Sequence, residues 1–208
     1  MSVALIQFAK YVRPEVIGCP EIQILDAILR ASIVFCNKSR YIKETFNVTT
    51  VAGTNKYVMA NMPVDVQARE IVNVKRGLYQ DLDPSSFREF QNNDLNTLPG
   101  TPQYFYMDKD RKLVFGNIPV AIETLSVTAI VRPKETAITL PDTLFDEYVD
   151  EIAAGAKSRL MVMKGQPWTD VQQASIYQGL FNDAIESSNV RESKGSTNKA
   201  LRMVGNYF

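Results

Sequence analysis

The hydrophobic period changes twice along this chain, from helical to strand-like and back, and this change limits the possible folds most strongly. Between Pro20 and about Arg40, apolar residues recur every three or four positions, which predicts an amphipathic helix. Pro20 suits the first turn of such a helix, where an amide has no intrahelical acceptor. The predicted apolar face contains Ile22, Leu25, Ile28, Leu29, Ser32 and Phe35 or Cys36. Residues 1–19, which precede it and contain Pro14 and Gly18, indicate an irregular arm.

The middle of the chain, from Tyr41 to about residue 133, has the pattern of strands and turns. Alternation is cleanest at 124–132, where apolar residues occupy every second position. Asp83-Pro84 predicts a turn, and Ser85-Ser86 predicts a cap for a short helix over 87–91. A polar loop follows over 92–101. The predicted strands are 46–50, 56–59, 68–75, 104–107, 112–115 and 124–132.

The helical period returns after Asp142 and predicts two further helices. The first ends at Gly165 and Pro167, in the order typical of a helix C-terminus. The second starts near Thr169-Asp170 and ends near Asn189. The two apolar faces comprise Phe145, Tyr148, Val149, Ile152, Ala156, Leu160 and Met163, and then Ala174, Tyr177, Leu180, Phe181, Ala184 and Ile185.

This order of elements predicts an α+β protein with three parts. Residues 1–40 and 134–189 would form a helical bundle from the N- and C-terminal helices. An antiparallel β-rich domain would be inserted as residues 41–133, and residues 190–208 would form an extended C-terminal arm. Within the bundle, the small residues Ala153 to Ala156 predict close helix packing, and Trp168 would close the core at the corner between the last two helices.

Composition excludes several function classes. The chain has 23 Lys plus Arg and 23 Asp plus Glu, and this balance argues against a dedicated nucleic-acid-binding protein. It has no histidine, so the commonest general base and transition-metal ligand are absent. Catalysis by a Cys–His pair is therefore excluded, and we expect no cofactor and no metal.

The two cysteines, Cys19 and Cys36, are not expected to form a disulfide. A helix of 17 positions between them would separate them by roughly 25 Å, whereas a disulfide requires Cα atoms within about 7 Å. Free thiols are typical of synthesis in a reducing cytoplasm. No basic residue precedes the apolar start of the chain, and no uncharged stretch is long enough to span a bilayer, so we expect neither a secretory signal nor a membrane contact.

One acidic stripe, Asp142, Asp146 and Asp150 with Glu147 beside it, is the main candidate for chemistry. Four-residue spacing places these carboxylates on one helix face. They are either a divalent-metal or paired-carboxylate site of a hydrolase, or a solvated stripe favoured by the helix N-terminus. The solvated stripe is favoured because no second acidic helix supplies further ligands. In an oligomer, the stripe would meet basic residues of a neighbouring copy.

Two other patterns fail on their spacing or surroundings. Asp81, Asp83 and Ser85 resemble the start of a calcium-binding loop, but Ser86 and Asn92 stand where glycine and glutamate are required. Ser196 and Lys199 have the spacing of a Ser–Lys nucleophile but lie in a polar tail.

The C-terminal segment has two open interpretations. From Val190 onward it contains the basic residues Arg191, Lys194, Lys199 and Arg202 and one acidic residue, Glu192. It ends with the apolar residues Leu201, Met203, Val204, Tyr207 and Phe208. Such an ending favours docking, either on its own domain or on another subunit or partner, for instance by strand addition.

Short motifs along nearly the whole chain resemble the head-to-tail adaptor (connector) proteins of tailed bacteriophages, including the tail tubular proteins of short-tailed phages. The order of the predicted elements is also similar to that of this family. The motifs are Pro14-Glu-Val-Ile-Gly-Cys-Pro20, Gly100-Thr-Pro-Gln-Tyr-Phe-Tyr106, Leu113-Val-Phe-Gly-Asn-Ile-Pro119, Leu140-Pro-Asp142, Gly155-Ala-Lys-Ser-Arg-Leu160 and Gly165-Gln-Pro-Trp168.

The resemblance implies a structural virion protein without catalytic activity, made in the host cytoplasm. Such adaptors form a homo-oligomeric ring, usually a dodecamer, at the head–tail junction beneath the portal protein. The β-domain would face the next tail protein, and DNA would pass through the channel during ejection without sequence-specific binding. The C-terminal arm would bind the portal through Lys199, Leu201, Arg202, Met203, Val204, Tyr207 and Phe208. The alternatives are another tail component, such as a tail-completion or tail-hub protein, and the metal-dependent hydrolase.

Overall fold

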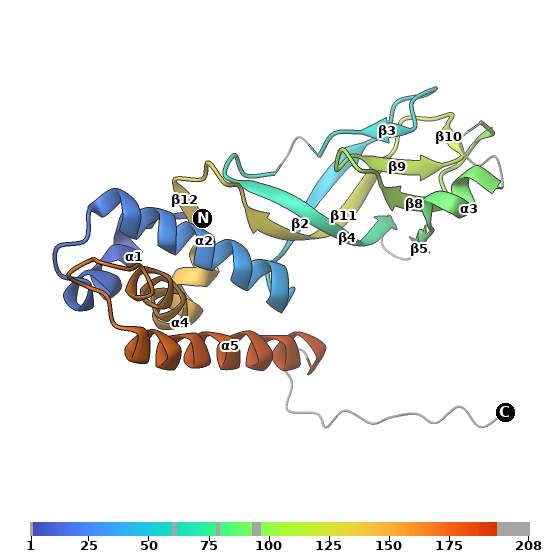
Figure 1. Ribbon diagram of the computed structural model, residues 1–208. Coiled ribbons are helices and arrows are strands. Elements are labelled where there is room, and N and C mark those ends of the chain that lie inside the picture. Colours follow the sequence, from blue (N-terminus) through green and yellow to red (C-terminus); the bar gives the residue numbers. More distant parts are fainter. Residues whose placement is uncertain (1, 60–61, 78–79, 93–96, 195–208) are drawn as a thin grey trace, which may run out of the picture. The chain divides into compact units, whose positions relative to one another are not determined.

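The computed structural model describes residues 2–59, 62–77, 80–92 and 97–194 (Figure 1). The protein is α+β, as the periodicity predicted. It divides into two compact units, residues 1–41 with 135–208 and residues 42–134. We call the first the helical unit and the second the strand unit.

The helical unit begins with ordered structure where an irregular arm was predicted. Strand β1 (Ser2–Ala4) pairs antiparallel with β12 (Thr139–Pro141), and helix α1 (Leu5–Val12) and a 3-10 turn (Arg13–Glu15) follow. Helix α1 buries Leu5, Phe8, Ala9 and Val12. The expectation of an irregular arm was wrong because this spacing already has a helical period, which the nearby proline and glycine obscured.

Helix α2 (Glu21–Ser39) follows Pro20, which caps it in an extended conformation, and it ends at Arg40 in the left-handed region (φ 53°). Its buried residues include Ile28, Ser32, Phe35 and Cys36, as predicted. The prediction was wrong at Ile22, which is 77% exposed. The buried face is centred instead on Ile24, Ala27 and Ala31.

Helix α4 (Asp142–Met161) packs against α1, α2 and α5 (Val171–Lys194), and Figure 1 shows it between α2 and α5. From Ile152 to Met161 every side chain except Arg159 is buried. Tyr148 has non-helical torsion angles (φ −138°, ψ 22°) and kinks the helix. An interior that surrounds the helix on several sides explains why its sequence is apolar beyond one stripe.

The contact between α4 and α5 depends on the small residues that the sequence singled out. A Cβ atom on Gly155 would lie 2.7 Å from the Phe181 ring, so the two helices approach too closely for a larger residue. The Phe181 ring also lies 6.3 Å from that of Phe35 on α2. The predicted close packing and the burial of Trp168 after α4 are both confirmed.

Helix α5 extends to Lys194, so residues 190–194 of the predicted arm are helical. Leu180, placed on the buried face by the sequence, is 53% exposed, whereas Ala174, Phe181, Ala184 and Ile185 are buried. Leu180 lies at the edge of the apolar stripe and points to the outer side of the helix.

The strand unit contains two four-stranded sheets. The first has the order β2-β11-β4-β5 and is antiparallel, with Leu125 opposite both Val48 and Arg76. The second has the order β3-β9-β8-β6, in which β8 and β9 form the predicted hairpin. The strands are β2 (Lys43–Thr49), β3 (Lys56–Tyr57), β4 (Val66–Arg76), β5 (Gln80–Asp81), β6 (Asp83–Pro84), β7 (Pro99–Gly100), β8 (Tyr104–Met107), β9 (Leu113–Gly116), β10 (Ile118–Pro119) and β11 (Thr124–Pro133).

Antiparallel pairing holds for the long strands, while two short pairs, β6 with β8 and β7 with β10, are parallel. Strand β7 lies within the segment predicted as a loop. Helix α3 (Phe87–Asn92) has the predicted serine cap. The Glu89 amide donates to Ser86 Oγ, and the Ser86 amide donates to Glu89 Oε2 at 2.7 Å, which completes a capping box.

Neither Cys19 nor Cys36 forms a disulfide, as the sequence predicted. Across the described ranges, no helix is long and apolar enough to cross a bilayer.

Candidate functional site

The acidic stripe on α4 is divided by the kink at Tyr148. Asp142 lies at the start of the helix and accepts a hydrogen bond from the Thr143 amide at 3.1 Å. Asp146 and Asp150 are exposed, and within the described part of the chain neither has an ion-pair partner. In the same part, no group of three or more Asp, Glu or Cys side chains is arranged to hold a metal ion. The stripe is a surface feature, and its geometry gives no support to a metal-dependent hydrolase.

Glu147, beside the stripe, is the centre of a cluster at the C-terminal end of α5. Its Oε2 atom accepts a hydrogen bond from the Tyr41 hydroxyl at 2.9 Å and lies 2.8 Å from Nη1 of Arg191. The Arg191 guanidinium lies over the Tyr41 ring at 5.7 Å, and the Tyr41 ring meets that of Tyr148 edge-on at 5.3 Å. Burial, reinforced by the bond to the Glu147 carboxylate, raises the pKa of Tyr41 to about 12.

This cluster fastens the last turns of α5 to the kinked part of α4. Arg191, which the sequence assigned to a basic arm, is therefore an ion-pair partner within its own chain. Sequence reasoning missed the pair because 44 residues separate its members and no local pattern connects them.

A second cluster joins the 3-10 turn to α4 and α5. Lys157 is almost fully buried, and its Nζ atom lies 2.7 Å from Oε1 of Glu15 and 4.9 Å from the centre of the Tyr177 ring. The Tyr177 hydroxyl donates to the same carboxylate. Although burial opposes ionisation, the hydrogen bonds from Lys157 and Tyr177 lower the pKa of Glu15. All these groups bind one another, so the cluster is structural.

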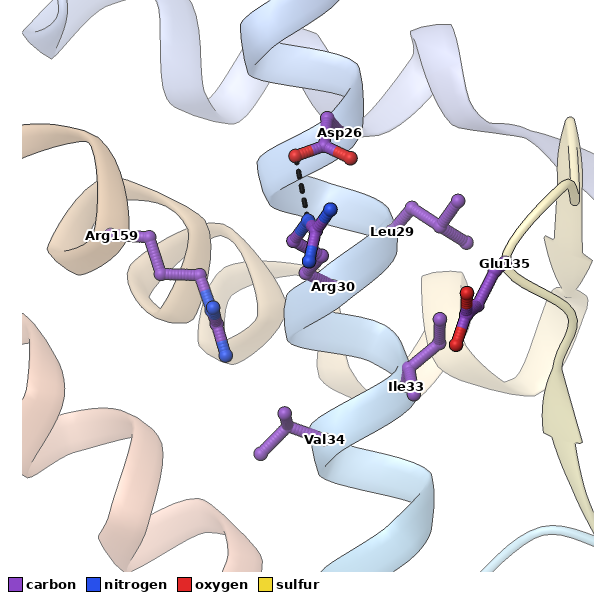
Figure 2. Close-up of a pocket in the computed structure, with 7 residues that line it drawn as sticks. All are labelled: Asp26, Leu29, Arg30, Ile33, Val34, Glu135 and Arg159. Carbon is purple, nitrogen blue, oxygen red and sulfur yellow. Dashed lines mark hydrogen bonds and ion pairs between the residues drawn. The ribbon is translucent and has the colours of Figure 1, made fainter.

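A groove follows the outer side of α2 beside the end of α4 (Figure 2). One part has a volume of about 270 Å³, and the adjoining part, of about 570 Å³, shares Asp26, Arg30 and Arg159 with it. Asp26 accepts a hydrogen bond from Arg30 at 2.8 Å. Arg159 extends from α4, and no partner for its guanidinium lies among the described residues. The first part is lined by Asp26, Leu29, Arg30, Ile33, Val34, Glu135 and Arg159, and the second by Ile22, Gln23, Asp26, Ala27, Arg30, Arg159, Val162 and Met163.

The strand unit has its own hollow of about 640 Å³ beside the β8–β9 hairpin. The rings of Phe87 and Tyr106 lie 5.9 Å apart along it. Burial, together with the nearby Asp108 charge, raises the pKa of Tyr106. Asp108 itself is occupied, since its Oδ1 atom accepts bonds from the amides of Asp110 and Lys112 in the hairpin turn. The hollow therefore presents aromatic surface rather than a reactive group.

The residues proposed to bind a portal lie outside the described residues, as does Ser196. They are Lys199, Leu201, Arg202, Met203, Val204, Tyr207 and Phe208. The described chain ends at Lys194 in α5, close to the cluster around Glu147.

In the helical unit, the clusters around Glu147 and Lys157 hold elements together through ion pairs and hydrogen bonds, and exposed apolar residues lie along α5 and in the groove beside α2. Such surfaces suit assembly with other protein chains. The comparison with curated proteins gives no match. Residues 6–203 match the family described as SU10 adaptor protein. Because that match spans almost the entire sequence, the chain belongs to the SU10 adaptor protein family, a family of phage head-to-tail adaptors.

Proposed function

We propose that this chain is a structural virion protein that forms a ring between the portal and the tail and lines part of the DNA channel. The observation that carries the proposal is the match to the adaptor family over residues 6–203. The ring would be a homo-oligomer of twelve copies and would have no catalytic activity. The strand unit would face the next tail protein.

The charge of the chain supports a channel role. Equal numbers of basic and acidic residues give a formal net charge of zero. A protein that neutralises many phosphates binds DNA tightly and non-specifically. A neutral wall instead lets DNA slide past during ejection.

The cluster around Glu147 supports a role for the C-terminal segment as an arm. Its ion pair with Arg191 fixes the last turns of α5, so the segment after Lys194 starts from a fixed point. In the proposal, the residues beyond that point bind the portal through the basic residues Lys199 and Arg202 and the apolar end at Tyr207 and Phe208.

Electron microscopy of the purified protein mixed with the portal protein of the same phage tests both parts of the proposal. A ring stacked coaxially on the portal is the expected result. A variant truncated after Lys194 keeps Arg191 and its ion pair, so it removes the arm alone. This variant should lose the association, and if it joined the portal as the full chain does, the arm would have another role.

Another tail component, such as a tail-completion or tail-hub protein, is the alternative. It would be favoured if the full chain did not associate with an intact portal. Labelling the chain in whole particles would then locate it along the tail axis.

A further inference from the structure

We propose that the outer face of α5 of one copy docks into the groove between α2 and the end of α4 of a second copy. The outer face of α5 comprises Ile176, Gly179, Leu180, Asp183, Glu186 and Val190. The inference rests on the proposed function in one respect, that copies of this chain assemble with one another. It adds the two surfaces that meet.

Three large apolar side chains on the outer face of α5 are exposed to solvent. Ile176 and Leu180 are each 53% exposed and lie four residues apart. Val190, which is 50% exposed, follows Ile176 by fourteen residues, about four helical turns, and so lies on the same side. Ile176 and Val190 lie on the side opposite to Phe181 and Ala184, which pack on α4, and Leu180 lies at the edge between the two sides. Two such residues one turn apart form a ridge of the kind that fits a groove on another helix.

Gly179, in the middle of this face, lies beside open space. A Cβ atom there would have no atom within 4 Å, whereas at Gly155 it would clash with Phe181. Glycine lowers helix stability relative to alanine, so a glycine in an exposed helix needs another reason. Close approach of a second chain is such a reason, because the missing side chain lets a neighbouring helix come near.

The receiving surface is the part of the groove near Ile22. Ile22 is 77% exposed, Val162 53% and Met163 38%, and all three line the hollow of about 570 Å³ together with Arg159. In the proposed contact, the Ile176–Leu180 ridge lies against these three apolar side chains.

Charge complementarity identifies a second copy as the occupant. Asp183 and Glu186 are exposed on α5, and neither has an ion-pair partner within the described ranges. In the receiving part of the groove, Asp26 neutralises Arg30, which leaves the Arg159 charge uncompensated. Glu135 lines only the other part of the groove. A ridge with two free carboxylates therefore meets a hollow with one free guanidinium.

The two surfaces lie on opposite sides of the helical unit, as assembly of many copies requires. The inner faces of α2 and α5 meet through Phe35 and Phe181, so their outer faces point away from each other. A contact between two different surfaces of the same chain is head-to-tail, and it leaves one of each surface free for the next copy. Such contacts produce rings when the rotation closes.

Two kinds of variant test the inference in the full-length protein, with and without the portal, by mass photometry and electron microscopy. Gly179→Gln fills the gap on the outer face and should leave the melting temperature unchanged or raised, while self-association falls at least about tenfold. Asn182→Gln lies at the flank of this face, keeps the side-chain amide that accepts a hydrogen bond from Gln178, and serves as the matched control. It should assemble as the wild type does.

Charge reversal supplies the specific readout. Asp183→Arg and Arg159→Asp should each weaken assembly at least about tenfold, because each places like charges together. Combining both reversals in one chain should restore it. Restoration would exclude a merely structural role for either residue.

Failure of the inference differs from failure of the proposed function. If the wild type assembles with itself but does not bind the portal, the proposed portal role is wrong. The inference still holds in that case, provided that the variants behave as stated. Normal assembly by Gly179→Gln and both single reversals overturns the inference. A wild type that stays monomeric alone and with the portal also overturns it. If truncation after Lys194 instead increases assembly and the double reversal restores nothing, the chain's own C-terminal segment occupies the groove.

Discussion

The two glycines of the last helices should respond in opposite ways to the same substitution. Gly155→Ala and Gly179→Ala each add one methyl group to a helix interior. At both positions the helical conformation itself gains about 1 kcal/mol from the replacement. The two sites differ only in what the added atom would meet.

The structure supplies the size of that difference. At Gly155 the new Cβ would lie 2.7, 2.8 and 3.0 Å from three atoms of the Phe181 ring. Carbon atoms prefer separations of about 3.5–4.0 Å, so these contacts are too short. Inserting a methyl group into a packed core costs about 1–3 kcal/mol of stability. The Phe181 ring is rigid and lies between two helices, so it has few ways to move aside. At Gly179 nothing lies within 4 Å, so the full gain remains.

Gly179→Ala should therefore raise the free energy of unfolding by about 1 kcal/mol, and Gly155→Ala should lower it by up to about 2 kcal/mol. The two free energies then differ by up to about 3 kcal/mol, which for a chain of this length separates the two melting temperatures by up to about 6–12 °C. Thermal unfolding followed by circular dichroism at 222 nm measures both, and urea titration converts the shifts to free energies.

A third variant checks the cause. Replacing Phe181 by leucine in the Gly155→Ala background reduces the ring clash, so part of the lost stability should return although Phe181→Leu alone is destabilising. Equal melting temperatures for the two alanine variants would refute the reasoning, and so would a Gly155→Ala loss that the leucine leaves unchanged.

Three further predictions concern the core, the buried ion pair and the helix cap. Phe35→Ala should cost about 3–5 kcal/mol, since this fully buried ring contacts both Tyr148 and Phe181, and urea unfolding measures the loss. Glu15→Gln should cost only about 1 kcal/mol at pH 7 because the Glu15 side chain is 39% exposed and partly screened by solvent. A lowered pKa means that this contribution is present above the ordinary value of 4.5 and is lost as the pH falls through the folded value, so the wild type and Glu15→Gln should converge in acid. Ser86→Ala should cost about 1 kcal/mol by removing the cap of α3, with faster amide exchange confined to that helix.

Each of these predictions has its own contrary outcome. A Phe35→Ala loss below about 1 kcal/mol would mean that its site collapses around the smaller side chain. If the difference in unfolding free energy between wild type and Glu15→Gln did not become smaller at low pH, the charge of the Glu15 carboxylate would not be the cause of the stability loss. Exchange that accelerated throughout the strand unit after Ser86→Ala would mean that the cap acts beyond α3.

Local pattern alone predicted the elements whose faces are strongly periodic. The strand at 124–132 alternates without interruption, and in the structure it is β11, paired on both edges. Helices α2 and α4 and the β8–β9 hairpin were found in the same way, and the cap of α3 was predicted from Ser85-Ser86 after a turn. These signals are local because the residues that produce them contact one another within a few positions.

The family was also accessible from the sequence, because short motifs are spread along the whole chain and residues 6–203 match the adaptor family. The candidate acidic stripe was only partly predicted. Its spacing was correct, but the kink at Tyr148 divides it, and the pairing of Glu147 with Arg191 removes one carboxylate from it. Neither the kink nor the ion pair could be predicted from the residues of the stripe alone.

The sequence by itself determined the helices and strands with a strong hydrophobic period, that Cys19 and Cys36 form no disulfide, and that the chain lacks the groups for histidine-based chemistry. The tertiary structure decided which side of each helix is buried. Ile22 and Leu180 have the spacing of core residues, yet both are exposed, because a residue at the edge of an apolar stripe is buried only if another element covers it. The burial of Lys157 was also decided by the tertiary structure. Its charge is tolerated in the interior because Glu15 and Tyr177, from distant parts of the chain, lie against it. Long-range neighbours are set by packing, and no local period encodes them.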